Sequence, residues 1–249
     1  MAGKQKLIIG IHSVSALLSQ KPEQISGLLI QAGRSDRRLR KLLDKANSSG
    51  IAIEELEKSE MDRRVGGVHQ GVAALYEGGE TTTHEPALFQ LLDTLQADPL
   101  LLVLDEVTDP HNLGACLRSA DAAGVHAVII PKDRASPLTA TVSKVASGAA
   151  ETVNLITVTN LARCLQKLKK RGIWLVGTDN QSGKALFEQD LTGPLALVLG
   201  SEGTGLRRLT RESCDFLVAI PMAGAVSSLN VSVAAGVALF EAVRQRRPD

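Results

Sequence analysis

Aromatic residues are scarce in this sequence of 249 residues, which contains one Trp, one Tyr and four Phe. Residues 7–76 hold only one of them, Tyr76. This scarcity excludes a surface there that reads single-stranded nucleic acid by stacking its bases on aromatic rings. Any nucleic-acid contact in this part of the chain has to use phosphates and shape.

Cysteine is also sparse. Cys116, Cys164 and Cys214 are an odd number at wide spacings, with no C-x-x-C pair and no Cys/His cluster of zinc-binding spacing. This pattern argues against a disulfide framework and against a metal site. We therefore predict reduced, mostly buried thiols and no bound metal.

Long hydrophobic runs are missing too. None approaches the ~20 residues needed to span a bilayer. The N-terminal segment MAGKQKLIIGIHSVSALL lacks the long apolar stretch and the small-residue cleavage site of a secretory signal. We expect a soluble, cytoplasmic protein with no membrane partner.

The net charge is only +1, but it is unevenly distributed. Residues 1–79 carry 12 Lys+Arg and 9 Asp+Glu, a balance of +3, and the remaining residues carry 16 and 18, a balance of −2. The excess lies in and beside one predicted helix, at Arg34, Arg37, Arg38, Arg40, Lys41 and Lys45. A phosphate-binding patch and a solvated helix face would look alike here.

The hydrophobic pattern predicts two α/β domains, 1–79 and 98–249, with a linker and lead-in helix at 80–97. In the first domain we expect strands at 7–9, 28–31, 51–54 and 71–76, and helices at 13–19 and 36–46. A polar, turn-rich stretch at 78–86 and a helix at 87–96 lead to the second domain. Its apolar strands are expected at 100–104, 127–130, 153–157, 174–176, 195–199 and 217–220, with helices at 112–123 and 230–245. Apolar strands alternating with helices predict a parallel sheet covered on both faces.

Three unusual loops follow strands of the second domain, where ligands gather in open α/β sheets. They are residues 105–114, a glycine-rich loop at 200–205, and residues 221–230. Arg118 lies in the helix after the first loop, nearly two turns beyond Asn112, so both side chains can project from the same side.

Each feature also has a purely structural explanation. Asn112 could cap its helix, and Arg118 could form a surface salt bridge. The glycines could serve only a tight turn, with Glu202 solvated, and the paired serines before the last helix could cap it. For His111 we favour a structural or substrate-side role over that of a general base.

The order and spacing of the motifs are more specific than any one of them. Three segments resemble the signature motifs of the SpoU (TrmH-type) branch of the SPOUT RNA 2′-O-ribose methyltransferases: Asn112-x-Gly114-x-x-x-Arg118, LVLGSEGTGL (197–206) and IPMAGAVSSLNVSVAAGVALFEA (220–242). The similarity covers the entire second domain. Within the branch, the chain is most similar to the bacterial enzymes that methylate a guanosine of 23S ribosomal RNA, and GIHSVSALL (10–18) and VHQGVAAL (68–75) resemble their N-terminal domain.

The resemblance implies a deep trefoil knot, one of the rare exceptions to unknotted chains, and a homodimer. It implies that S-adenosylmethionine binds in the knot, at Gly177, Leu199, Gly200, Ile220, Met222 and Leu229. The family's catalytic set maps onto Asn112, Arg118, Glu202, Ser228 and Asn230. The N-terminal domain is implied to deliver the RNA, and we place its phosphate contacts at Arg34, Arg37, Arg38 and Lys41.

A ribose hydroxyl must lose a proton as it takes up the methyl group, and a guanidinium is a poor proton acceptor. We therefore expect Arg118 to grip a phosphate and to stabilise the developing alkoxide, while an RNA phosphate or a water takes the proton. Glu202 is expected to order the glycine loop. Ser228 and Asn230 are expected to hydrogen-bond the ribose or the cofactor.

The function expected from the sequence is methylation of the ribose 2′-hydroxyl of a guanosine in 23S ribosomal RNA, with S-adenosylmethionine as the methyl donor. The same reaction on transfer RNA and a non-catalytic RNA-binding protein that keeps the fold are alternatives. A nicotinamide-dependent oxidoreductase is a further alternative, against which the missing G-x-G-x-x-G argues.

Overall fold

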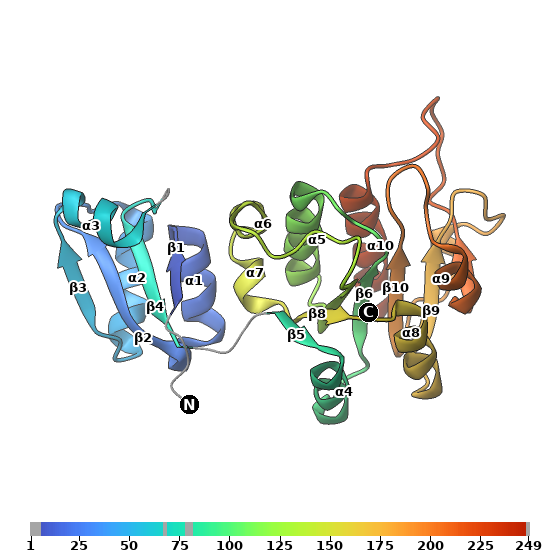
Figure 1. The fold of residues 1–249 in the computed structure, drawn as a ribbon, viewed down its shortest axis with the longest axis horizontal. Helices are drawn as coiled ribbons and strands as arrows, with labels where there is room; N and C mark the ends of the chain where they lie inside the picture. Colours follow the sequence, from blue (N-terminus) through green and yellow to red (C-terminus); the bar gives the residue numbers. More distant parts are fainter. Residues whose placement is uncertain (1–5, 67–68, 78–81, 248–249) are drawn as a thin grey trace. The chain divides into compact units, whose positions relative to one another are not determined.

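The computed structural model describes residues 6–66, 69–77 and 82–247. The chain divides into two compact units (Figure 1). The first unit is Met1–Glu80 with Ser147–Thr152, and the second is Thr81–Ala146 with Val153–Asp249.

The first unit is built on a four-stranded sheet of order β1-β4-β2-β3, in which only the β2–β3 pair is parallel. α1 and α2 pack on one face, around Leu17, Leu28 and Leu39, and α3 packs on the other through Met61. α3 was not predicted, because Met61 is its only buried residue and the sequence shows no apolar stripe. The elements are β1 (Lys6–Ile9), α1 (Ile11–Gln20), η1 (Pro22–Gln24), β2 (Ile25–Gln31), α2 (Arg37–Ser48), β3 (Ile53–Leu56), α3 (Lys58–Val65), β4 (Val72–Tyr76) and the short α7 (Ala149–Thr152).

The second unit is a seven-stranded parallel sheet of order β11-β9-β10-β6-β7-β8-β5. Its strands are β5 (Thr82–His84), β6 (Leu100–Leu104), β7 (Ala127–Pro131), β8 (Leu155–Val158), β9 (Trp174–Thr178), β10 (Leu195–Leu199) and β11 (Phe216–Val218). Its helices are α4 (Glu85–Thr94), α5 (Pro110–Ala122), α6 (Ala140–Ala146), α8 (Leu161–Lys170), η2 (Leu186–Glu188), α9 (Arg208–Ser213) and α10 (Val231–Arg246).

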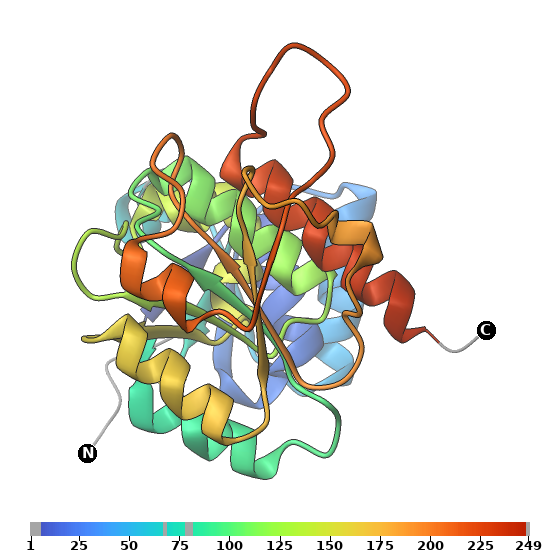
Figure 2. The ribbon, with the colours of Figure 1, turned by 90° about the vertical axis from the view of Figure 1, so that its right-hand side faces the viewer.

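Helices cover both faces of this sheet, as Figure 2 shows: α5 and α10 lie on one side, and α4 and α8 lie on the other. Every residue of the central strands β6 and β10 is buried. Within β6, Leu101 and Val103 face the α8 side, where they join Leu165 and Leu168 in one apolar cluster. The predicted parallel sheet with two covered faces is therefore confirmed.

The stretch predicted as linker, residues 78–86, holds regular structure in its described part. β5 pairs in parallel with β8, and α4 begins at Glu85 with Pro86 in its first turn. Residues 78–81 lie outside the described residues. The prediction missed β5 because its stability comes from pairing with β8 rather than from its own polar sequence.

No helix within the described part of the chain has the length and apolar character needed to cross a membrane.

Candidate active site

A cavity of about 390 Å³ opens at the carboxyl ends of β9, β10 and β11. The loops that follow these three strands form its walls, because in a parallel sheet such loops all emerge at the same edge. We call it the β10 cavity. Its lining includes Thr178, Asp179, Leu199, residues 200–206, Ile220, Met222, Ser228, Leu229 and Val231.

The glycine loop after β10 closes on itself. Ser201 N donates to Gly205 O at 3.2 Å, and Gly205 N donates to Ser201 O at 3.0 Å. A Cβ on Gly200 would lie 2.1 Å from the carbonyl carbon of Gly205, so no other residue fits there without moving backbone. Gly203 and Gly205 have φ of 84° and 67°, which L-residues rarely adopt. The turn needs its glycines, and it brings backbone to the wall of the β10 cavity.

An ion pair between a buried carboxylate and the partly exposed Arg207 holds the chain just after this loop. Asp105, which directly follows β6 and is fully buried, accepts from Arg207 N at 3.1 Å and from Arg207 Nε at 2.7 Å. Removing one partner of such a pair leaves a buried charge uncompensated. Asp105 lies in one of the three unusual loops of the sequence, but its pairing with Arg207 was not predicted, because only the sheet order brings β6 beside β10.

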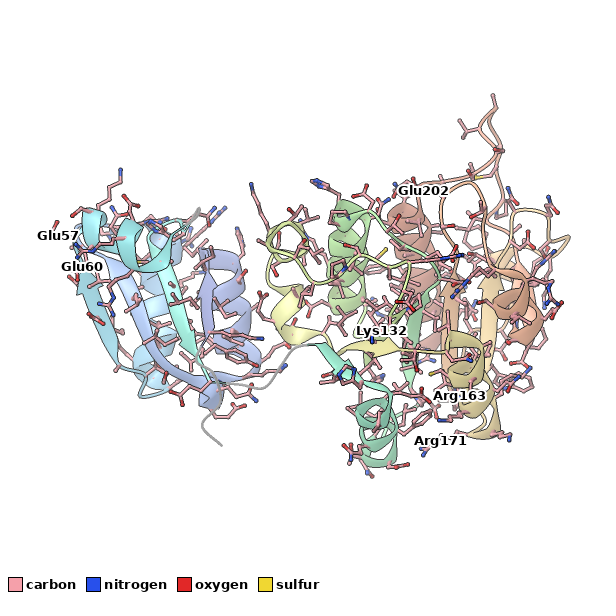
Figure 3. The ribbon with its side chains drawn as sticks, in the orientation of Figure 1. Glu57, Glu60, Lys132, Arg163, Arg171 and Glu202 are labelled. Atoms are coloured by element: carbon pink, nitrogen blue, oxygen red, sulfur yellow. The ribbon has the colours of Figure 1, made fainter. Side chains whose placement is uncertain are left out.

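Glu202 joins the N-termini of two helices. Its Oε1 accepts from Asn112 Nδ2 at 3.1 Å, from Asn230 Nδ2, and from Val231 N at 3.4 Å. Asn230 Nδ2 also donates to Asn112 Oδ1 at 3.0 Å. Figure 3 shows Glu202 beside the helices that carry these two residues, α5 and α10. A carboxylate is favourable at this place because helix N-termini carry partial positive charge.

Helix capping by Asn112 or by the paired serines, and a solvated Glu202, were the structural explanations considered for these residues. The structure supports none of the three. α5 is capped by Asp109, whose Oδ1 accepts from His111 N at 2.8 Å, so Asn112 is not the cap. α10 is capped by Asn230, which accepts from Ser232 N at 2.9 Å, so the preceding serines are not the cap either. Glu202 is exposed, yet it is a hydrogen-bonded member of the network rather than a solvated turn residue.

Arg118 is not brought into the network. It is exposed on α5, and no described residue hydrogen-bonds or ion-pairs with its guanidinium. Arg118 follows Asn112 by six residues, and each residue of a helix turns it by about 100°. The two side chains therefore point roughly a third of a turn apart, and the prediction that both project from the same side was wrong. Ser228 is exposed and lines the β10 cavity.

Five of the six residues predicted for the cofactor line the β10 cavity: Leu199, Gly200, Ile220, Met222 and Leu229. Gly177 does not. A Cβ on it would lie 2.7 Å from Cys214 Sγ and 2.9 Å from Leu206 Cδ1, so this glycine lets β9 pack closely under the loop.

The loop after β9 was not predicted to belong to the site. Thr178, Asp179, Asn180 and Gln181 line the β10 cavity, and Asp179 forms an ion pair of 2.7 Å with Arg211, which also lines it. The position of these residues, directly after an apolar strand, is the signal that could have found them.

The three cysteines are free thiols, and Cys116 and Cys164 are buried, as predicted. Burial raises the pKa of each of the three thiols to about 12. A thiol with so high a pKa is not a nucleophile near neutral pH. Within residues 6–66, 69–77 and 82–247, no His, Cys, Asp or Glu residues gather in a group of three that could hold a metal ion.

In the first unit, Arg37, Arg38 and Lys41 are exposed on α2. Arg34 precedes the helix and differs from them, since it is half-buried and its Nε donates to Asp36 at 2.8 Å. Asp36 caps α2, accepting from Arg38 N and Leu39 N at 3.0 Å each. Of the four predicted phosphate contacts, the three on α2 are therefore exposed.

The site combines a cavity walled by a glycine loop with a cluster of amides around one carboxylate. Residues 99–240 match the model of the SpoU rRNA Methylase family. The chain belongs to this family. The resemblance seen in the three motifs is thus confirmed, and these motifs supply the α5, glycine-loop and α10 parts of the site. A second model, described as RNA 2′-O ribose methyltransferase substrate binding, matches residues 7–81.

Several SpoU relatives match this chain along nearly its whole length. A Pseudomonas putida protein named 23S rRNA (guanosine-2′-O-)-methyltransferase RlmB is 55% identical over 240 residues, 96% of each chain. The Escherichia coli protein of the same name is 54% identical and covers 97% of this chain and 99% of its own. The structure of the SpoU methyltransferase AviRb from Streptomyces viridochromogenes in complex with AdoMet has a TM-score of 0.73 and 27% identity, covering 97% of this chain and 90% of that one.

Proposed function

We propose that this chain transfers a methyl group from S-adenosylmethionine to the ribose 2′-hydroxyl of a guanosine in 23S ribosomal RNA. The observation that carries the proposal is the 55% identity to a 23S rRNA (guanosine-2′-O-)-methyltransferase over 96% of both chains. The cluster of Asn112, Glu202 and Asn230 beside the β10 cavity supports it. The chain is an S-adenosylmethionine-dependent ribosomal RNA methyltransferase.

The β10 cavity fits S-adenosylmethionine. Its volume of about 390 Å³ lies within the range of small-molecule sites. Leu199, Ile220 and Leu229 offer apolar wall for the adenosine, and the glycine loop offers backbone groups at close range. When bound, the cofactor supplies a methyl group that its sulfonium already activates.

The residues of the chain orient and stabilise the reacting groups. Glu202 fixes the side-chain amides of Asn112 and Asn230, so these polar groups are held in place before the RNA arrives. Such preorganised dipoles can stabilise charge as it develops. The guanidinium of Arg118 has no partner in the described chain and is available to a phosphate and to the developing alkoxide.

The direct test is methylation of 23S ribosomal RNA isolated from a strain that lacks the gene. We expect the purified protein and radiolabelled S-adenosylmethionine to methylate one guanosine ribose, mapped by its resistance to alkaline cleavage. Transfer RNA from the same strain is the control. Methylation of transfer RNA alone would refute the proposed substrate, and cofactor binding without methylation of either RNA would indicate a non-catalytic RNA-binding protein.

We also propose that the second unit contains the trefoil knot implied by the family, and that the protein acts in the cytoplasm, where ribosomal RNA is found. The strand order supports a knot. β10 lies between β9 and β6, β11 lies beyond β9, and the chain then returns to place α10 against β10 and α5. The domain roles proposed from the sequence are RNA delivery by residues 1–79 and catalysis by residues 98–249.

The protein is proposed to be a homodimer joined through the second unit. α10 exposes Val233 by 51% and Phe240 by 49%, on the side opposite its buried residues Ala235, Ala238 and Ala242. These two side chains, seven residues apart on one helix face, offer apolar surface that a second copy of the chain would cover.

We expect light scattering to give a dimer at micromolar concentration, and Phe240→Glu to give a monomer. The matched control is Phe187→Glu, because Phe187 is 53% exposed but lies outside α10. A wild-type monomer would refute the dimer, and a dimeric Phe240→Glu variant would refute this interface.

The exposed cations of α2 are proposed to bind RNA phosphates. We expect the triple charge reversal Arg37→Glu, Arg38→Glu and Lys41→Glu to weaken RNA binding and its salt dependence, with cofactor affinity unchanged. The control exchanges Lys and Arg at the same positions and keeps the charge. If the reversed variant methylates its natural RNA like the wild type, this surface is only a solvated helix face.

A further inference from the structure

A second cavity, of about 440 Å³, lies at the carboxyl ends of β7 and β8 and shares no lining residue with the β10 cavity. We call it the β8 cavity. Its apolar lining is Pro131, Leu161, Ala162 and Leu209, and its polar lining includes Asp133, Asn160, Arg207 and Arg208. Leu209 is 54% exposed, so apolar surface is accessible at this cavity.

Two polar side chains that line the β8 cavity have hydrogen-bonding atoms without a described partner. The Oδ1 atom of Asn160 accepts from Arg163 N at 3.0 Å, which leaves the Nδ2 donor without a partner in the described part of the chain. Asp133 is exposed, and no described side chain pairs with its carboxylate. One donor and one acceptor therefore line a space of nucleotide size.

Lys and Arg residues are concentrated on the segments beside this cavity. α8 and α9 pack against each other, and residues 160–171 and 207–213 together carry eight Lys or Arg and a single acidic residue, Glu212. Lys132 belongs to the same surface, because its backbone N donates to Val158 O at 2.8 Å, two residues before Asn160. Figure 3 labels Lys132, Arg163 and Arg171 along this part of the unit.

Some of these cations form ion pairs, and others have no partner among the described residues. Six of the eight form ion pairs with carboxylates, among them Lys167 with Glu85 at 2.6 Å and Arg208 with Glu212 at 2.9 Å. Arg163 and Lys170 are exposed on α8, and no described residue pairs with either. They are seven residues apart, which is two turns and about 10 Å along one side of the helix, so both can contact the same nucleic-acid strand.

We propose that the β8 cavity and the basic face of α8 form a second RNA-binding site, on the catalytic unit itself. A nucleobase enters the cavity, where Asp133 and Asn160 meet its polar edge, and Arg163 and Lys170 contact the phosphates beside it. This inference rests on the proposed function. RNA fits better than an acidic peptide because the site combines cations with a partly apolar cavity that offers both a donor and an acceptor.

The position of the site agrees with this role. Arg207 lines the β8 cavity and lies two residues after the glycine loop that carries Glu202. The cavity and the Asn112–Glu202–Asn230 cluster both lie at the carboxyl edge of the sheet. An RNA strand whose ribose reaches that cluster can therefore continue into the β8 cavity.

The electrostatic arm of the test is the double variant Arg163→Glu with Lys170→Glu, measured with a fragment of 23S ribosomal RNA. We expect RNA binding to weaken roughly tenfold or more near physiological salt, and the slope of log K against log salt to fall by about 1.5 to 2 for two lost contacts. Cofactor affinity and the thermal midpoint stay unchanged. Wild-type RNA affinity and slope in this variant would overturn the proposal.

Two controls match this variant. Arg163→Lys with Lys170→Arg keeps the charge and is expected to bind RNA normally. Lys58→Glu with Arg63→Glu makes the same change in net charge on α3, beside Glu57 and Glu60 (Figure 3), and is expected to leave RNA affinity unchanged. An equal loss in this second control would mean that only total charge matters, which would overturn a specific site.

The cavity arm uses Ala162→Phe, which fills the β8 cavity, and Asp133→Asn, which removes an exposed carboxylate without adding bulk. We expect both to raise the KM for RNA with the salt slope and cofactor affinity unchanged. If neither variant changes that KM, no nucleotide binds in the cavity. Failure of the proposed function is distinguishable, because then the wild type itself would not methylate 23S ribosomal RNA.

Discussion

Replacing Arg118 by lysine is expected to leave a partial rate of methyl transfer that does not recover as pH rises. Lysine keeps the positive charge but loses the planar fork that grips a phosphate at two points. RNA affinity should fall together with the rate. The measurement is a single-turnover pH–rate profile of the Arg118→Lys variant beside that of the wild type.

Arg118→Ala removes the charge altogether and should lower the rate by ~10²–10³, the usual cost of losing one preorganised stabilising group. The side chain is exposed and has no described partner, so the variant should fold and bind the cofactor normally. This separates a catalytic effect from a structural one.

The opposite hypothesis makes Arg118 the proton acceptor. A lysine there, with a reference pKa of about 10.4, would then gain activity steeply with pH. A rate that climbs about tenfold per pH unit in the lysine variant, while the wild type stays flat, would contradict the role of phosphate clamp.

The sequence predicted the central strands well because their patterns are local. Leu100–Leu104 and Leu195–Leu199 are uninterrupted apolar runs, and both are fully buried strands of the parallel sheet. The prediction failed where stability comes from partners elsewhere in the chain. β5 forms only by pairing with β8, and α3 is nearly all polar with one buried residue.

For the site, the motifs named the residues but not their connections. Asn112 and Glu202 are 90 positions apart, and their 3.1 Å hydrogen bond depends on β10 lying beside β6. The same neighbourhood creates the contact between Asp105 and Arg207. Strand order is not a local property, so spacing in the sequence could not predict either pair.

Two carboxylates hold the glycine loop through hydrogen bonds at different positions. Asp105 anchors Arg207, two residues after the loop, while Glu202 ties the first half of the loop to α5 and α10. The loop is therefore shaped before any ligand binds. Preorganisation of this kind reduces the entropy that binding would otherwise lose.

Gly200→Ala is expected to weaken S-adenosylmethionine binding by more than about 100-fold, which corresponds to about 2.7 kcal/mol. The added Cβ would lie 2.1 Å from the Gly205 carbonyl carbon and 2.4 Å from Leu206 N. These are backbone atoms, so the whole turn has to open, and overpacking of this kind costs about 1–3 kcal/mol. Calorimetric titration of the cofactor measures the change.

Gly224→Ala is the matched control, because Gly224 lies in the loop before α10 and a Cβ there meets nothing within 4 Å. We expect it to bind the cofactor like the wild type. A general loss of stability in Gly200→Ala is separated by thermal unfolding with and without cofactor. At 100 times its Kd a ligand stabilises the folded state by about 2.7 kcal/mol, and the same cofactor concentration should barely shift the variant's midpoint. A full cofactor-induced shift in Gly200→Ala would show that the closed turn is not needed for binding, and the β10 cavity would then lose its assignment as the S-adenosylmethionine site.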